Sequence, residues 1–528
     1  MIRIRSRYTL LASLLTLTQF AQAQIAPEVP RMVVNILVDQ LRSDYLQAFS
    51  PLYGEGGFVR LMNEGKTYTQ AEYPFAEPDR ASSSACFYTG ASPYENGIVG
   101  RRWLNRQTLT PIFCVDDAQQ TGIRTNEKVS PQHLGVSTLG DEVKVSTEGA
   151  SLVYSVSPFS DICVMGAGHA GDGAFWLDDN TGSWCSSSYY LQSEPKWLEA
   201  YENQQGLVDR INSITWKPLN DLVGNFNYFL AEGQRKPFQH RFTGERKFRQ
   251  LKASACVNDE VLRFVEHLMK FTSLGVDGAA DMLNVTLYAG SFDHQSVNEF
   301  GMEMQDTYAR LDRTIEDLIS LVERRTGKGK ALFVLTSTGY TDPEGKQDLG
   351  KYRIPTGTFS ITRAKLLLNM YLIAVYGSGQ YVETALDNEL YLNLKLIENR
   401  NLNLSEVLER SCDFLIQLAG VRDVYSSQRL IHSADIPGAN RLRNAYNPKC
   451  SGDILVKVQP GWTILNEDTH EESLVRESYM PFPLFIMGPG VPCEKVRVPI
   501  SIDQVAPTLA QMLRIRAPNA CHQAPLNY

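Results

Sequence analysis

The stretch RMVVNILVDQLR, residues 31–42, decides the fold class. An apolar run, residues 32–38, leads directly into Asp39. Such runs are typical of parallel strands that are buried on both faces of a sheet. The segments NVTLYAG (284–290), ALFVLTS (331–337) and PFPLFIMGPG (481–490) predict three more strands of this kind.

A helix is predicted between the second and third of these strands. Apolar side chains recur every three or four residues from Met304 to Val322, and Gly327 follows as a stop signal. Strand, helix and strand in this order form a βαβ unit. We therefore expect an α/β fold, with a doubly wound, largely parallel central sheet and helices on both faces.

Ligands of such sheets bind beyond the carboxyl ends of the strands. Asp39 comes at one of these ends, and SFDHQ (291–295) and TSTGYT (336–341) follow two others. The convergence of these three segments predicts a site at this edge of the sheet.

The N-terminus has the pattern of a secretory signal peptide. Three arginines precede an apolar run that ends in Ala21-Gln22-Ala23, which predicts a signal peptide over residues 1–23 and cleavage before Gln24. The run is shorter than a membrane span needs, and no later stretch is long and apolar enough to supply one. We expect a periplasmic or secreted protein with no transmembrane segment.

Charge and cysteine content narrow the class of protein further. The net charge of -8 argues against a nucleic-acid partner, because nucleic-acid-binding proteins usually carry a basic face. The nine cysteines permit disulfides in an oxidising compartment. Because their number is odd, at least one is expected to be free or paired between chains.

Two stretches fit the sheet pattern poorly. Residues of about 190–255 are aromatic and charged, and residues of about 355–460 contain short strands and the helix LSEVLERSCDFLIQLAG (404–420), ended by Gly420. Neither is bounded by a Pro/Ser-rich linker. The prediction is therefore a single domain over residues 24–528 with two insertions that cover the strand tips.

Several segments together resemble the alkaline phosphatase superfamily. They run in the family's order through residues 32–516: VVNILVDQLRSDYL (33–46), YGEGGFVRLMNEGKTY (53–68), YTGASPYENGIVGRRW (88–103), STLGDEVK (137–144), GAGHAGDGAFWLDDNTGSW (166–184), FGMEMQDTYARLDRTIEDL (300–318) and SIDQVAPTLAQMLRI (501–515). The chain is most similar to the type I phosphodiesterase/nucleotide pyrophosphatase branch and, within it, to the phosphate-irrepressible periplasmic alkaline phosphatases.

The resemblance implies two zinc ions and a Thr or Ser nucleophile at a helix start. The family's zinc ligands are an Asp after the first strand, an Asp-x-x-x-His pair, an Asp-His pair and a late His. Carboxylates and imidazoles suit zinc, which lowers the pKa of the nucleophile. Asp39 matches the first ligand. The nucleophile position in FAEPDRASSSACFYTG (75–90) falls on Arg80, which cannot lose a proton or attack phosphorus.

The other functional positions also depart from the family pattern. The Asp-x-x-x-His pair falls on His294 and Asn298, preceded by Asp293, and the Asp-His pair falls on Thr338 and Gly339. The late His is most simply Tyr479. The family's phosphate-holding Lys-x-Arg pair falls on Phe159 and Asp161, which puts an acid where an anion should dock.

These substitutions predict a pseudoenzyme with no intact metal site and no expected cofactor. Arg80 is predicted to fill the vacated metal space, paired to Asp39 or Asp293. Ser82, Ser83 and Ser84 are interpreted as small residues that pack a helix start. The predicted partner is a small anion held by Arg80, a glycan or peptide, or another envelope protein.

Two alternatives remain open at this point. One is a hydrolase with a reduced site, in which Asp39, Asp293 and His294 hold zinc. The other is a structural subunit of an envelope assembly. Two further histidines have ordinary interpretations. His169 is expected to take part in backbone packing, and the setting of His470 is as typical of a solvated surface as of a functional site.

Overall fold

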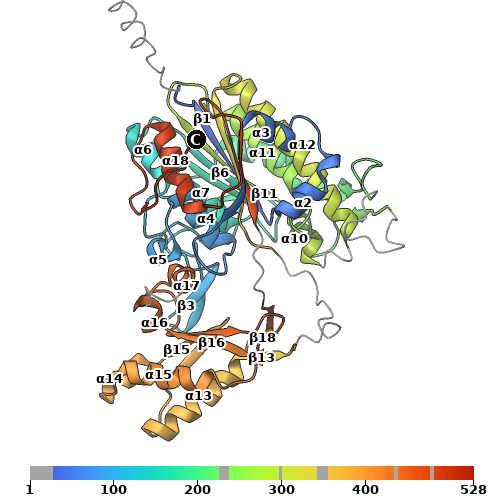
Figure 1. Cartoon of the computed structure of the whole chain (residues 1–528). Helices are drawn as coiled ribbons and strands as arrows, with labels where there is room; N and C mark the ends of the chain where they lie inside the picture. Colours follow the sequence, from blue (N-terminus) through green and yellow to red (C-terminus); the bar gives the residue numbers. More distant parts are fainter. Residues whose placement is uncertain (1–27, 225–236, 296–299, 342–354, 433–437, 476–480) are drawn as a thin grey trace, which may run out of the picture.

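A computed structural model describes residues 28–224, 237–295, 300–341, 355–432, 438–475 and 481–528. In this part of the chain, eleven strands form the central sheet (Figure 1). Ten of them follow one another across the sheet in the order β21 (Glu494–Val496), β2 (Lys66–Glu72), β20 (Phe482–Met487), β12 (Ala331–Ser337), β1 (Met32–Asp39), β11 (Asp281–Tyr288), β6 (Val153–Ser157), β7 (Gly173–Leu177), β8 (Trp184–Ser187) and β5 (Gly122–Ile123), and β22 (Ile500–Ser501) also pairs with β2.

The centre of the sheet is parallel, as predicted. Strand β1 pairs in parallel with both β11 and β12, and β11 pairs in parallel with β6. Every residue of β1 and β11 is buried. The predicted fourth strand exists as β20, but the prediction of its direction was wrong, because β20 runs antiparallel to β12 and β2. An apolar run reports burial on both faces and carries no information on strand direction.

Helices cover both faces of the sheet (Figure 1). One face carries α4 (Arg80–Thr89), α6 (Leu139–Ser146), α7 (Ser160–Ala167) and α18 (Val505–Leu513). The other carries α3 (Phe58–Glu64), α11 (Cys256–Phe271) and α12 (Gly301–Thr326), with the short α2 (Ser43–Ala48) beside them. Helix α12 confirms the predicted βαβ unit, and it ends at Gly327, whose φ of 94° is a left-handed conformation that favours glycine.

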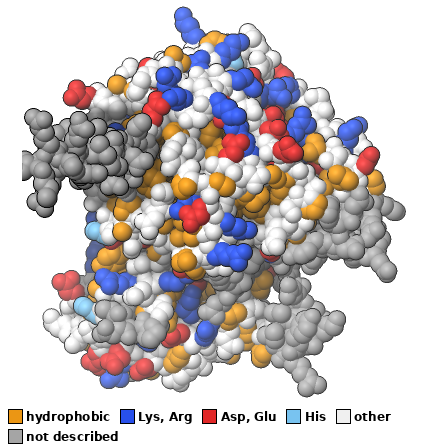
Figure 2. Space-filling view, turned by 45° about the horizontal axis from the view of Figure 1, so that its top comes forward, with side chains coloured by type: hydrophobic (Ala, Val, Ile, Leu, Met, Phe, Trp, Pro, Cys, Tyr) orange, Lys and Arg blue, Asp and Glu red, His pale blue; other side chains and the backbone are white. Residues whose placement is uncertain are grey.

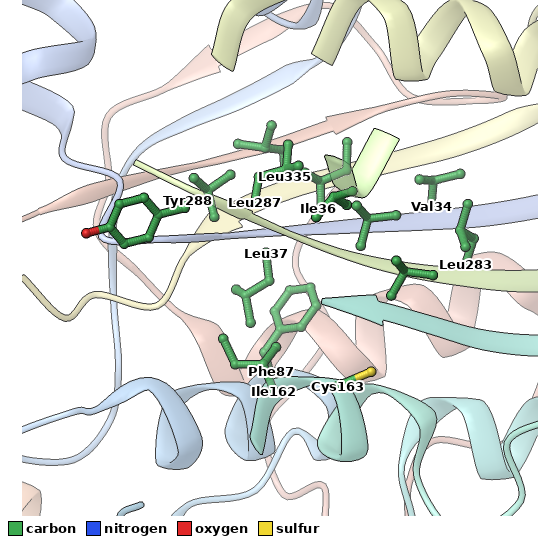
Figure 3. Packing of buried hydrophobic residues seen from close by; sticks show 14 of the residues in the cluster. Val34, Ile36, Leu37, Phe87, Ile162, Cys163, Leu283, Leu287, Tyr288 and Leu335 are labelled. Carbon is green, nitrogen blue, oxygen red and sulfur yellow. The ribbon is translucent and has the colours of Figure 1, made fainter. Parts of the chain in front are cut away.

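The core lies between the sheet and these helices. Figure 3 shows Leu37 of β1 next to Phe87 of α4 and Ile162 of α7, all of them buried. A buried polar contact sits in the same region, where the Asn35 amide donates to the Asn284 side chain at 2.8 Å. Burial of this apolar surface is the main stabilising term, at about 25 cal/mol per Å².

The described part of the first poorly fitting stretch joins this same core. It contains α8 (Lys196–Gln205), α9 (Leu207–Arg210), the hairpin of β9 (Thr215–Trp216) and β10 (His240–Arg241), and α10 (Lys247–Lys252). Tyr201 of α8 and Phe264 of α11 make an edge-to-face ring contact at 5.3 Å. The stretch is thus packed onto α11, and α10 brings basic side chains to the strand tips.

Residues 358–475, which we call the cap, carry a second hydrophobic cluster. Its strands form two small sheets, β13 (Thr358–Ser360) with β18 (Thr463–Asn466) and β19 (Glu471–Leu474), and β14 (Val382–Leu386) with β15 (Glu389–Leu392), β17 (Ile454–Val458) and β16 (Val421–Ser426). Its helices are α13 (Ile361–Tyr376), α14 (Leu394–Asn399), α15 (Leu404–Leu415), α16 (Ser427–His432) and α17 (Ala439–Ala445). Helix α15 ends at Leu415, five residues before the predicted stop at Gly420. The assignment of the whole chain to a single domain with two insertions stays a prediction.

A hairpin from the main body supports the cap. It consists of β3 (Arg102–Asn105) and β4 (Thr110–Phe113), and its Leu104 clusters with Leu386 and Tyr391 of the cap. Between its strands, Arg106 forms two 3.0 Å hydrogen bonds to the carboxylate of Asp453. The cap is therefore held next to the strand tips by both apolar and charged contacts.

Two further sequence predictions concern the whole chain. No helix in the described ranges is long and apolar enough to cross a membrane. All nine cysteines lie in these ranges, and each is a free thiol in the structure. The predicted signal peptide lies outside the described residues.

Candidate functional site

A cavity of about 1080 Å³ lies between the carboxyl ends of the central strands and the cap. Its floor includes Asp39 at the end of β1, together with Arg80 and Asp161 at the starts of α4 and α7. Its roof includes Asp387 and Glu389 of the cap. The site predicted at this edge of the sheet is thus an open cavity with walls from distant parts of the sequence.

Helix α4 starts at the floor of this cavity. Asp79 is its N-cap, and its Oδ1 accepts hydrogen bonds from the backbone N–H and the hydroxyl of Ser82, both at 2.8 Å. Oδ2 of the same carboxylate accepts from the backbone N–H of Arg101 at 2.6 Å. Ser82, Ser83 and Ser84 are all buried in the helix. The capped turn therefore presents Arg80, its first residue, to the cavity.

The guanidinium of Arg80 is paired with Asp161. Its Nε donates to both carboxylate oxygens, at 3.0 and 3.1 Å, and its Nη2 donates to Oδ2 at 3.0 Å. The guanidinium also stacks over the ring of Phe159 at 3.7 Å. Only 13% of the Arg80 side chain and 8% of the Asp161 side chain are exposed. The pair is a bidentate ion pair held in a desolvated setting.

Of the two partners predicted for Arg80, the structure confirms Asp39, and it adds Asp161 as a closer one. Asp39 lies farther away, with its Oδ2 3.9 Å from Nη1 of Arg80. Asp293 pairs instead with Arg246, at 3.0 Å. Asp161 and Arg80 are 81 residues apart and meet because α4 and α7 pack side by side on one face of the sheet. That contact depends on the packing of two helices, which local sequence patterns do not report.

Both members of the pair are charged across the working pH range. Burial alone would raise the pKa of Asp161, but the charges of Arg80 and Arg101 outweigh it and lower the pKa to about 2. Burial alone would lower the pKa of Arg80, but the charges of Asp161 and Asp39 raise it above its ordinary value. Arg101 contributes a further bond from its Nε to Asp161, at 3.1 Å.

Asp39 is held by a hydroxyl group. Thr338 donates from its Oγ1 to Oδ1 of Asp39 at 2.9 Å, and the same Oγ1 accepts from the backbone N–H of Gln40 at 3.2 Å. The next residue, Gly339, has a φ of 66° and lies against the rings of Tyr73 and Phe482. A side chain at this position would therefore meet both steric and backbone strain.

The other candidate ligands are engaged or lie elsewhere. Asp293 accepts from Arg246 at 3.0 Å and from the Gln250 amide at 3.3 Å. His294, which also lines the cavity, packs its ring edge-on against Tyr288 at 6.1 Å. Asn298 and Tyr479 fall outside the described residues. Their placement stays a prediction.

The residues present do not fit the two-zinc site that the resemblance implies. A guanidinium lies 3.9 Å from the single carboxylate that matches a ligand, and its charge would repel a metal cation. Where the family has Asp and His, Thr338 and Gly339 offer a hydroxyl and no side chain. Across the described ranges, no group of three His, Cys, Asp or Glu side chains could hold a metal ion.

Several cavity residues carry no sequence signal. Lys252 of α10 donates to the Leu177 carbonyl at 2.8 Å, bonds to Asp179, and lies over Phe159 at 5.3 Å. Glu127 lines the same wall and comes from a loop with no recognisable motif. Single charged residues in loops are common on any surface, so only the fold brings these side chains together.

His169 does more than the backbone packing expected of it. Its ring bonds to Asp141 and to the Leu134 carbonyl, both at 3.1 Å. The hydrogen bond that the ring donates to the Asp141 carboxylate is the main cause that raises the pKa of His169. His169 does not line the cavity.

The chain is similar to several characterised proteins over nearly its whole length. A family model described as type I phosphodiesterase / nucleotide pyrophosphatase matches residues 33–480. Alkaline phosphatase PhoV of Synechococcus elongatus is 28% identical over 534 residues, which cover 95% of this chain and 94% of PhoV. Alkaline phosphatase PafA of Elizabethkingia meningoseptica is 27% identical over 526 residues, which cover 96% and 95% of the two chains.

The fold is shared with a solved structure as well. The crystal structure of wild-type PafA matches with a TM-score of 0.79 at 25% identity, covering 94% of this chain and 98% of that one. The predicted α/β architecture and the resemblance noted in the sequence are thereby confirmed.

Proposed function

The chain belongs to the type I phosphodiesterase/nucleotide pyrophosphatase family, and from this premise we propose that it binds a ligand or partner in its cavity without hydrolysing phosphate esters. The observation that carries the proposal is the buried Arg80–Asp161 pair at the start of α4. Arg80 stands at the position from which the family's nucleophile attacks. The guanidinium of an arginine keeps its protons at accessible pH, so it cannot act as a nucleophile.

Asp161 argues against a second requirement of the reaction, the binding of phosphate. It stands where the family holds phosphate with basic side chains, and its pKa of about 2 keeps it negatively charged. A phosphate ester that entered this corner would meet a carboxylate at close range. Repulsion between like charges in a water-poor site disfavours that encounter.

The state of Asp39 supports the same proposal. Its Oδ1 already accepts from Thr338, and its Oδ2 faces Arg80. Zinc there would have to displace the guanidinium and break the Asp161 pair. We include in the proposal that the protein is exported after cleavage near Ala23-Gln24 and works in the periplasm or outside the cell.

A second candidate is a metal-dependent hydrolase with a reduced site. Asp39, Asp293 and His294 all line the cavity. Relatives of similar length carry the name alkaline phosphatase. This activity would depend on zinc and would be lost with a chelator.

The test is hydrolysis of p-nitrophenyl phosphate and bis-p-nitrophenyl phosphate by the purified mature chain, with added zinc and with EDTA. We expect no turnover above buffer in either condition. We also expect none from Arg80→Thr, because a restored hydroxyl would still lack the metal ligands. The matched control is Asp39→Asn, purified in the same way, which reports any contaminating phosphatase.

Turnover that needs zinc and vanishes in Asp39→Asn would refute the proposal and establish the hydrolase. Turnover that persists in Asp39→Asn would come from a contaminant, and the assay would be repeated on the repurified chain until the two preparations differ or both are inactive.

A further inference from the structure

The cavity carries more negative than positive side chains. Eleven carboxylates line its described part, against six Lys and Arg side chains. On the outer face drawn in Figure 2, by contrast, basic and acidic side chains are interspersed. The imbalance of the cavity wall is thus not seen on that face.

Each of these six basic side chains is already in an ion pair. Their carboxylate partners all line the cavity too: Arg80 and Arg101 pair with Asp161, Arg102 with Asp387 and Glu471, Arg246 with Asp293, and Arg249 and Lys252 with Asp179. The positive charge of the cavity is thus neutralised from within. An incoming anion would have to break one of these pairs to gain a cationic partner.

Four lining carboxylates have no ion-pair partner within the described ranges: Asp79, Asp116, Glu127 and Glu389. Asp79 is already engaged as the N-cap of α4. Oε2 of Glu127 is buried and has no hydrogen-bond partner there. Glu389 accepts from the Tyr391 hydroxyl at 2.8 Å and from the Gly452 N–H at 2.9 Å, both neutral donors. A carboxylate oxygen buried without a partner is costly, and a bound cation would remove that cost.

The pKa values of Glu127 and Glu389 also favour a cationic ligand. Burial is the main cause that raises the pKa of Glu127, and it raises the pKa of Glu389 to about 7. Lys252 lowers the pKa of Glu127 and Arg106 lowers that of Glu389, but in each case the loss of water around the carboxylate outweighs the cation. A cationic ligand would lower both.

We propose that the cavity binds a small organic cation with two or more ammonium groups, of the linear polyamine type. The proposal rests on the binding role proposed above and names its ligand class. Asp116, Glu127 and Glu389 come from three separate elements, the loop after β4, the loop before Val129 and strand β15 of the cap, which suits ammonium groups spaced along a chain. The volume of about 1080 Å³ accommodates a molecule of that size.

The walls favour an organic cation over a metal ion. The rings of Phe113 and Tyr340 line the cavity; aromatic rings contact methylene groups, and their faces attract ammonium groups. The described carboxylates do not converge into a set of three that could hold a metal. Spaced carboxylates and aromatic rings in one cavity match an alkyl chain bearing several ammonium groups.

The test is calorimetric titration of the mature chain with spermidine at low salt, and in parallel with inorganic phosphate. We expect spermidine to bind and phosphate not to bind. Glu127→Gln and Glu389→Gln should each weaken spermidine binding about five-fold, because each removes one charge contact and keeps the size of the side chain. The matched control is Glu199→Gln on α8, an exposed glutamate that does not line the cavity, and its affinity should equal that of the wild type.

Circular dichroism of each variant confirms folding, and the two cavity variants act as independent tests. The cation assignment is overturned if spermidine fails to bind, if Glu199→Gln weakens binding as much as the cavity variants, or if phosphate binds in its place. Failure of the binding role itself has a different signature, which is zinc-dependent phosphoester turnover lost in Asp39→Asn. If the chain hydrolyses no phosphoester and does not bind spermidine, only the proposed ligand class is refuted.

Discussion

Replacing Asp161 by Asn should be among the most destabilising single changes in this protein. The substitution keeps the size of the side chain and removes its charge. It leaves the guanidinium of Arg80, whose side chain is 13% exposed, with only the more distant Asp39 oxygen at 3.9 Å. Breaking a buried ion pair from one side typically costs about 3–5 kcal/mol, because the remaining charge stays buried without its partner.

The reverse change should cost less. In Arg80→Met, Asp161 keeps its bond from Arg101 at 3.1 Å, although that arginine is 53% exposed and its contact is screened by water. The contact of the guanidinium with Phe159, about 0.5–2 kcal/mol, is replaced by apolar packing. We expect a loss of about 2–3 kcal/mol.

The double variant Arg80→Met/Asp161→Asn isolates the interaction. Because neither charge remains, its loss should be about 3 kcal/mol, well below the sum of the single losses of about 5–8 kcal/mol, which gives a coupling of about 2–5 kcal/mol. Urea unfolding followed by tryptophan fluorescence measures all four proteins. Five of the six tryptophans lie outside the cap, so this signal reports the domain that holds the pair. A loss below about 1 kcal/mol for Asp161→Asn, or additive single losses, would refute the buried-pair interpretation.

The same pair predicts a dependence on acid. The pKa of Asp161 is about 2 in the folded chain, below the value of about 3.9 for a free aspartate. The stabilisation is therefore fully present above pH of about 4 and is lost as the pH falls towards 2. The difference in stability between the wild type and Asp161→Asn should shrink over that interval.

Three further outcomes are expected. Thr338→Val should cost about 1–3 kcal/mol in urea unfolding, because buried Asp39 loses its hydroxyl donor; Thr338→Ser, which keeps the donor, is the matched control, and equal losses would contradict the role of the hydrogen bond. The pKa of Glu389 is raised to about 7, with Asp387 and Arg106 as its charged neighbours, so wild-type stability should fall as the pH rises from about 4.3 to 7. Glu389→Gln should lack this fall. Parallel pH profiles of the two proteins would contradict the prediction. EDTA should leave the thermal midpoint unchanged, since no described group of side chains forms a metal site, and a drop in the midpoint that zinc restores would disprove this.

The sequence predicts the scaffold because the scaffold depends on local patterns. The residues of β1 are apolar enough to require burial on both faces, and the period of the apolar side chains in α12 specifies a helix. Strand direction is different, since β20 has the same kind of apolar pattern as its parallel neighbours yet runs antiparallel. Direction depends on the connection that precedes a strand, and its composition does not record it.

The site, like the scaffold, has features that the sequence predicts and features that only the fold reveals. The absence of a nucleophile at Arg80 follows from residue identity alone. Its partner does not, because Asp161 reaches it only through the packing of α4 against α7. The unpaired state of Glu127 is still harder to predict, since it depends on which basic side chains, such as Lys252, are already taken by other carboxylates.

These pairings connect the loss of phosphate chemistry that we propose with the sign of charge in the cavity. Asp161, at the position that the resemblance assigns to phosphate binding, requires a compensating cation, and Arg80, at the position that it assigns to the nucleophile, supplies it at 3.0 Å. Because Arg80 is used in this way, it is not available to an anionic ligand. The remaining basic residues of the wall are paired as well, so the change at these two positions leaves a cavity in which only negative charge is uncompensated. In our proposal, the substitutions that remove the reaction therefore also reverse the charge of the ligand that the cavity favours.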